Sequence, residues 1–217
     1  MKKHSTAKPP SGTSTFLPRT NSTLYKLGTG TIYEVLTPRG FAYLQFVQWR
    51  QDWEYELLRV VPRYFKTRVV DTDELPIDIE RYYTWCSLRG AIKKKWVSVV
   101  GRMEIASKWK SPPEFRSYRP ALPIEDAQSW AFCVDAKKQI WKKVTVAEMS
   151  EQQKDLPPDD LIGFASLLLQ LCTNWHPRDE LGLKLGQEPR KAKAFRKKWP
   201  DFERNFAEYL KADWRAT

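Results

Sequence analysis

The stretch GTGTIYEVLTPRGFAYLQFV, residues 28–47, determines the fold that we expect for this chain. Thr31 to Leu36 and Phe41 to Val47 are two runs of strand length, rich in β-branched and aromatic residues. The turn signal Pro38-Arg39-Gly40 separates the two runs, which therefore predict a β-hairpin. A third run, Glu56 to Val61, ends before a proline and extends the hairpin to a three-stranded antiparallel meander.

Further strands are expected downstream of the meander. The aromatic segment from Ile79 to Leu88 predicts a strand or a short helix. Lys95 to Ile105 alternates as a strand does, with Gly101 marking a bulge. Ser129 to Val134 and Gln139 to Val144 flank a polar turn and predict a second hairpin.

The hydrophobic period becomes helical in the last third of the chain. A short helix capped by Thr145 is expected first, and an apolar core helix from Leu161 to Cys172, capped by Asp159 or Asp160, follows it. Beyond it, large apolar residues recur at helical spacing and form an amphipathic stripe that Pro200 divides. These residues are Phe195, Trp199, Phe202, Phe206, Tyr209 and Leu210.

These elements predict an α+β fold with a curved, mostly antiparallel and barrel-like sheet of about six strands, a packed core helix and appended C-terminal helices. Three parts are expected along the chain. Residues 1–23, rich in Ser, Thr, Pro and Lys, form a disordered basic arm. Residues 24–176 form the α+β domain, and residues 177–217 form a basic amphipathic helical segment.

The composition favours a binding protein. The 217 residues include 10 Trp, 9 Tyr and 10 Phe and carry a net charge of +11, but only two histidines. Aromatic rings provide contact area at low entropic cost, and cations stack on their faces. No apolar run is long enough to cross a bilayer, and no secretory signal follows the basic N-terminus. Cys86, Cys133 and Cys172 are odd in number and far apart, which predicts buried thiols in a reducing compartment, the cytoplasm.

Catalytic and metal-binding patterns are weak, so we expect no enzyme, no cofactor and no metal. His4 lies in the predicted arm, and His176 follows the core helix as a structural residue. Asp71, Asp73 and Glu74 form a small acidic cluster, which is interpreted as a turn and a cap. A nuclease built on these three carboxylates is the least implausible enzymatic alternative.

The residues of the first hairpin resemble the bacterial immunity protein 26 family, small cytoplasmic proteins encoded beside polymorphic toxins. The likeness rests on Leu27 to Leu36 followed by Arg39 to Gln45, on Pro112 to Arg116 ahead of a Trp-bearing hairpin at Trp130, and on Met149 to Pro157. It covers residues 28–175 and implies a non-enzymatic inhibitor that occludes a partner protein. The basic ends lie outside it, the core helix is more apolar than the family suggests, and the net charge is positive although nuclease inhibitors tend to be acidic.

The leading hypothesis is therefore an immunity-type inhibitor that binds a partner protein, a toxin above all, through exposed aromatics around the first hairpin. Trp49 and Trp53 flank a polar turn where a strand does not easily bury both. The predicted contact residues are Tyr43, Trp49, Trp53 and Tyr55.

The alternative is a nucleic-acid-binding module, because the C-terminal segment interleaves cations with aromatics. Its predicted contact residues are Arg190, Lys191, Lys193, Arg196, Lys197, Lys198 and Trp199. The helical spacing of the aromatics favours their packing on the sheet, with the lysines left in water.

Overall fold

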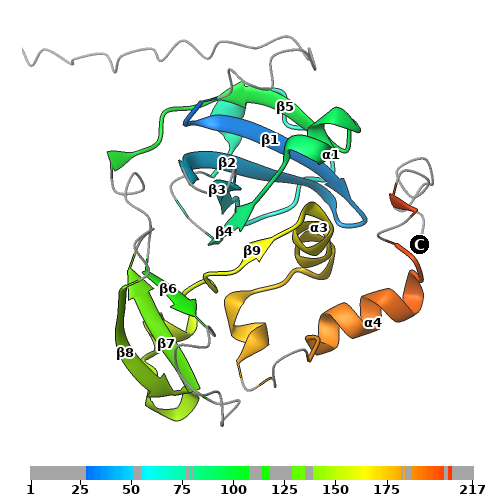
Figure 1. Ribbon diagram of the computed structural model, residues 1–217. Helices are drawn as coiled ribbons and strands as arrows, with labels where there is room; N and C mark the ends of the chain where they lie inside the picture. Colours follow the sequence, from blue (N-terminus) through cyan, green and yellow to red (C-terminus); the bar gives the residue numbers. More distant parts are fainter. Residues whose placement is uncertain are drawn as a thin grey trace, which may run out of the picture.

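A computed structural model of the protein describes residues 28–50, 55–76, 79, 81–107, 114–117, 129–134, 139–181, 183, 187–202 and 205–206. Figure 1 shows a large sheet, a small sheet below it and helices on one side of the large sheet. The expected basic arm at residues 1–23 lies outside the described residues.

The large sheet has its strands in the order β5-β1-β2-β3-β4-β9. All neighbours are antiparallel except β4 and β9, which are parallel, so the predicted α+β fold with a mostly antiparallel sheet of about six strands is confirmed. The sheet is open, so it is barrel-like only in a loose sense. The predicted meander is confirmed, as is the bulge beside Gly101, where the pairing with β1 shifts register. The strands are β1 (Thr31–Thr37), β2 (Gly40–Arg50), β3 (Tyr55–Val60), β4 (Tyr82–Cys86), β5 (Val97–Arg102) and β9 (Leu161–Ile162).

The second predicted hairpin belongs to a separate three-stranded antiparallel sheet. Its strands are β6 (Glu114–Ser117), β7 (Ser129–Val134) and β8 (Gln139–Thr145). Arg116 of β6 ties this sheet to the segment that leads into β9, because its backbone N–H donates to the carbonyl of Pro157 and its carbonyl accepts from the N–H of Asp159.

Short helices connect the strands, and one longer helix covers the large sheet. Among the described residues, the helices are η2 (Thr72–Glu74), α1 (Arg89–Lys93), η4 (Val146–Glu148), α2 (Glu151–Lys154), α3 (Phe164–Thr173), η5 (Pro177–Glu180) and α4 (Arg190–Lys198). Thr145 precedes η4 and bonds Glu148 through its backbone N–H and its hydroxyl, as the predicted cap requires. Within the described part of the chain, no helix has the length and apolar character that crossing a membrane requires.

The core helix begins later than the sequence predicts. Leu161 and Ile162 pair with Trp85 and Cys86 as strand β9, and α3 starts at Phe164 after an extended Gly163. Asp159 does not cap it, because this residue is buried and bonded to the backbone of β6. The apolar run alone predicts one helix, because a short buried strand and a buried helix share the same composition.

Both faces of the large sheet are covered. On one face, side chains of β1 to β4 such as Tyr33 and Leu44 pack against α3 and α1. On the other face, Ile32 and Tyr43 pack against the connection between β3 and β4, which crosses β2 where Phe41 bridges Phe65. Successive strand residues point to opposite faces, so β1 and β2 bury nearly every side chain.

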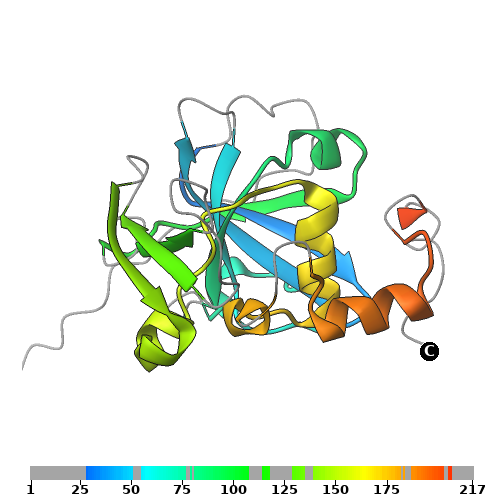
Figure 2. The ribbon, with the colours of Figure 1, turned by 60° about the horizontal axis from the view of Figure 1, so that its bottom comes forward.

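The described part of the C-terminal aromatic stripe docks on the large sheet's helical face, as its spacing predicts, whereas Tyr209 and Leu210 lie outside the described residues. Phe202 and Phe206 are 2% and 1% exposed and belong to the same core as α3. The Phe206 ring meets Trp96 edge-on at 5.3 Å, and the Phe202 ring meets Phe195 at 4.9 Å. The core of the sheet therefore includes residues from beyond residue 176, and α4 lies beside α3 (Figure 2).

The turn between β1 and β2 depends on Gly40. Its φ of +114° is disfavoured for residues that carry a side chain, and a Cβ there would lie 2.3 Å from the carbonyl oxygen of Phe65. The close approach exists because the N–H of Phe41 donates to that same carbonyl at 2.8 Å. Gly40 thus allows the connection between β3 and β4 to lie against the hairpin.

We predict that Gly40→Ala lowers the free energy of unfolding by about 2–4 kcal/mol, through backbone strain and the clash with Phe65. Gly90→Ala is the matched control, because a Cβ at Gly90 meets no atom within 4 Å and alanine favours the α1 helix. Urea unfolding of both variants checks the prediction, and equal stability of the two would contradict it.

Candidate functional site

Trp49 is the exposed aromatic side chain at one end of the large sheet. It lies near the end of β2 and is 47% exposed, and among the residues whose side-chain burial the structure describes, no other aromatic is exposed to this degree. Its ring meets Phe46 edge-on at 5.0 Å, which holds the indole in place while leaving part of it in water. Trp53 lies outside the described residues.

The expectation that Tyr43 and Tyr55 share this surface is only partly compatible with the structure. Tyr55 is half-buried against the core that contains Val47 and Leu57. Tyr43 is fully buried, so its predicted exposure is wrong. The reason is tertiary, since the connection between β3 and β4 covers the face of β2 from which Tyr43 projects.

Tyr43 belongs to a buried polar network instead. Its hydroxyl donates to Glu34 at 3.0 Å and accepts the backbone N–H of Val69 at 2.8 Å. The carboxylate of Glu34, itself 3% exposed, also accepts two bonds from Nε of Arg68 at 2.8 and 3.0 Å. This network fastens the connection between β3 and β4 to the first hairpin.

Glu56 is a second buried carboxylate, on β3 opposite Trp49. It accepts the backbone N–H of Leu88 at 2.9 Å and the hydroxyl of Tyr33 at 3.3 Å. Burial raises the pKa of Glu56 to about 7, and these two hydrogen bonds only partly oppose the rise. The Glu56 carboxyl therefore anchors Leu88, the residue that precedes α1, and its role is structural.

The seven residues of the predicted nucleic-acid surface all lie on or directly after α4. Its six cations are exposed, whereas Trp199 is half-buried against the core. Ala192, Phe195 and Trp199 recur at i, i+3 and i+7 and form the docked face. Arg190, Lys193 and Lys197 recur at the same spacing two residues earlier, and so lie on the opposite, solvent-facing side.

Two α4 cations are neutralised by carboxylates. Nζ of Lys191 lies 2.9 Å from Asp179, and Nε of Arg196 lies 2.6 Å from Glu188. Within the described part of the chain, Arg190, Lys193 and Lys197 have no ion-pair partner. The α4 cations thus divide into two that are held by carboxylates, Lys198 over the ring of Trp199, and a row of three without an ion-pair partner among the described residues.

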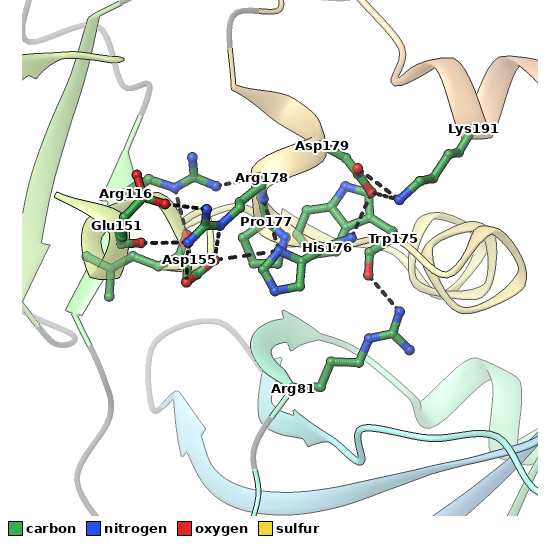
Figure 3. A network of polar contacts seen from close by, with 11 residues as sticks. Arg81, Arg116, Glu151, Asp155, Trp175, His176, Pro177, Arg178, Asp179 and Lys191 are labelled. Atoms are coloured by element: carbon green, nitrogen blue, oxygen red, sulfur yellow. Dashed lines mark hydrogen bonds and ion pairs between the residues drawn. The ribbon is translucent and has the colours of Figure 1, made fainter. Parts of the chain in front are cut away.

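Figure 3 shows the polar network that holds the segment after α3. Arg116 donates to the carbonyls of Leu156 and Pro177 at 2.6 and 2.7 Å, and Arg81 donates to the carbonyl of Trp175 at 2.9 Å. Asp179 accepts both the N–H of His176 and the ammonium of Lys191. The network therefore links the segment around η5 to the large sheet, to the small sheet and to the start of α4.

His176 is a capping residue in this network, in agreement with its predicted structural role. Its Nδ1 accepts a long bond of 3.4 Å from the N–H of Arg178, whose guanidinium pairs with Glu151 and Asp155 of the α2 region. Partial burial lowers the pKa of His176. The imidazole is thus positioned by the backbone N–H of Arg178 and by the nearby carboxylate of Asp155.

The acidic cluster after β3 forms a cap, as its turn interpretation predicts. Asp71 precedes η2, and its carboxylate accepts the N–H of Asp73 at 3.0 Å. Among the described residues, no group of three or more His, Cys, Asp or Glu side chains is placed to hold a metal ion.

The buried charges escaped prediction from sequence. Glu34, Glu56, Arg59 and Arg116 are each at most 4% exposed, although residues of these types usually lie at the surface. The only local signal was that three of them interrupt otherwise apolar strand runs. Comparison of the chain with known protein families, with curated proteins and with solved structures gave no match.

We predict that Glu56→Gln flattens the pH dependence of stability. The folded pKa of about 7 lies above the ordinary value of 4.5, so the folded state retains a proton that the unfolded chain releases. The contribution of Glu56 to the free energy of unfolding is therefore fully present below pH 4.5 and is lost as the pH rises through about 7. The loss approaches about 3 kcal/mol, and Gln cannot titrate.

Urea unfolding at about pH 5 and about pH 8 measures this difference. Burial also raises the pKa of Glu180 to about 7, so a residual slope is expected in the variant. The same pH dependence in both proteins would contradict the prediction.

Proposed function

We propose that the protein is a non-enzymatic binding protein of the immunity type, which inhibits a partner protein by covering part of its surface. The observation that carries the proposal is the exposed and braced ring of Trp49 at the end of β2. Tryptophan dominates the binding energy of many protein interfaces, because it buries a large area and loses little side-chain entropy.

The position of Trp49 supports this role. The β2–β3 end of the large sheet points away from α3 and α4 in both views (Figures 1 and 2). A partner can therefore reach the indole without displacing a helix. The resemblance to the immunity protein 26 family, over residues 28–175, includes the strands that present it.

The environment that we propose is the bacterial cytoplasm, with a toxin encoded by a neighbouring gene as the partner. Cys86 and Cys172 are free and buried, which supports a reducing compartment. Burial holds the pKa of both thiols well above the ordinary value, so they stay protonated.

We predict that Trp49→Ala weakens binding to the toxin by about 30-fold or more, as expected when a central interface aromatic is removed. The measurement is growth rescue of cells that express the neighbouring toxin, followed by titration of the purified pair. Ile79→Ala is the matched control, because this side chain is also exposed but lies outside the β2–β3 hairpin.

The wild type and Ile79→Ala should rescue growth, and Trp49→Ala should not. Thermal unfolding verifies that Trp49→Ala is folded. Full rescue by Trp49→Ala, or no rescue by the wild type, would refute the proposal.

A further inference from the structure

We infer that the outer face of α4 binds the phosphate backbone of a nucleic-acid duplex. This surface, here called the α4 cation row, consists of Arg190, Lys193 and Lys197. All three side chains are exposed and have no ion-pair partner within the described residues. The inference is independent of the protein-binding function proposed above.

The docking of α4 fixes which side chains a ligand can reach. Ala192 is buried, and Phe195 and Trp199 pack against the core, so the helix cannot rotate without exposing them. The cation row lies on the opposite side and spans about 10 Å along the helix axis. That length equals the axial rise of about three base pairs.

The same docking selects a duplex over a single strand. Proteins that bind single strands stack bases on exposed aromatic rings. The aromatic rings of α4 face the core, with Phe195 meeting Phe202 edge-on at 4.9 Å. The cation row therefore offers charge without a stacking platform, which suits sequence-independent contact with phosphates.

Two further cations lie over aromatic rings that pack against the same core as α4. Lys198 lies 5.6 Å from the ring centre of Trp199, and Lys94 lies 4.4 Å from that of Trp96. Trp96 meets Phe206, which places the end of α1 beside the segment that follows α4. By contrast, the exposed carboxylates Glu151 and Asp155 lie in the α2 region and are paired with Arg178.

The test is a salt series with fluorescent DNA and RNA duplexes of about 20 base pairs and the matching single strands. The logarithm of the binding constant should fall linearly with the logarithm of salt concentration. Arg190→Gln/Lys193→Gln/Lys197→Gln should reduce the magnitude of this slope by about 2.7, or about 0.9 per phosphate contact. A slope change of that size corresponds to about 40-fold in affinity between about 50 and about 200 mM salt.

Lys154→Gln is the control for removal of a cation away from α4, because Lys154 lies on α2 and is paired with Glu151 at 2.6 Å. It should leave the slope unchanged, as should Trp49→Ala, so that this inference and the proposed protein-binding function fail separately. Thermal unfolding checks that each variant is folded.

Similar binding of both duplexes, tighter than the single strands, is the expected result. The inference is overturned if the wild type fails to bind duplex at about 50 mM salt, or if the triple variant keeps the wild-type slope. Tighter binding of single strands would also overturn it. Equally tight binding of polyglutamate would assign the surface to an acidic protein instead.

Discussion

The packing of Phe202 and Phe206 against the large sheet is the constraint on which the arrangement of this protein depends. These rings lie in one core with α3 and β1, and Phe206 contacts both Trp96 and Phe164. The segment after α4 is therefore joined to α1 and α3. Because Phe195 and Trp199 pack on the same core, α4 is held in one rotational setting.

That rotational setting separates the two kinds of surface. The aromatic side of α4 becomes core, and Arg190, Lys193 and Lys197, which have no ion-pair partner among the described residues, are solvent-exposed on the opposite side. The network around Asp179 supports the same orientation from the start of the helix, through Lys191 (Figure 3). The exposed aromatic is found elsewhere, at the far end of β2. Within α4, side chains that are interleaved in the sequence are thus sorted by face, with Phe195 against the core and Arg190, Lys193 and Lys197 in water.

Prediction from sequence succeeded where local chemistry decides the structure. The meander follows from strand-length runs between turn residues, and Gly40 sits where its positive φ is required. The C-terminal aromatic stripe also packs as its period indicates, as far as the structure describes it, up to Phe206. In these places the local pattern and the tertiary structure agree.

Prediction from sequence failed where the structure of a segment depends on residues far away in the chain. Leu161 and Ile162 form a strand because β4 offers them an edge, and Tyr43 is buried because residues more than 20 positions away cover it. The partners of Arg116 lie 40 and 61 residues along the chain. The sequence around Arg116 does not distinguish this buried charge from an exposed one. The exposure of Trp49 was predictable, because a large residue beside a polar turn has few neighbours to cover it.

The stability of Phe202→Ala tests most directly whether the C-terminal aromatics belong to the core and so orient α4. Urea unfolding, followed by tryptophan fluorescence, is compared with that of the wild type and of Lys197→Ala, a substitution on the exposed face of α4. Phe202→Ala should lower the free energy of unfolding by about 3–5 kcal/mol in one cooperative transition, with Lys197→Ala nearly unchanged. A change of less than about 0.5 kcal/mol in Phe202→Ala would contradict this account.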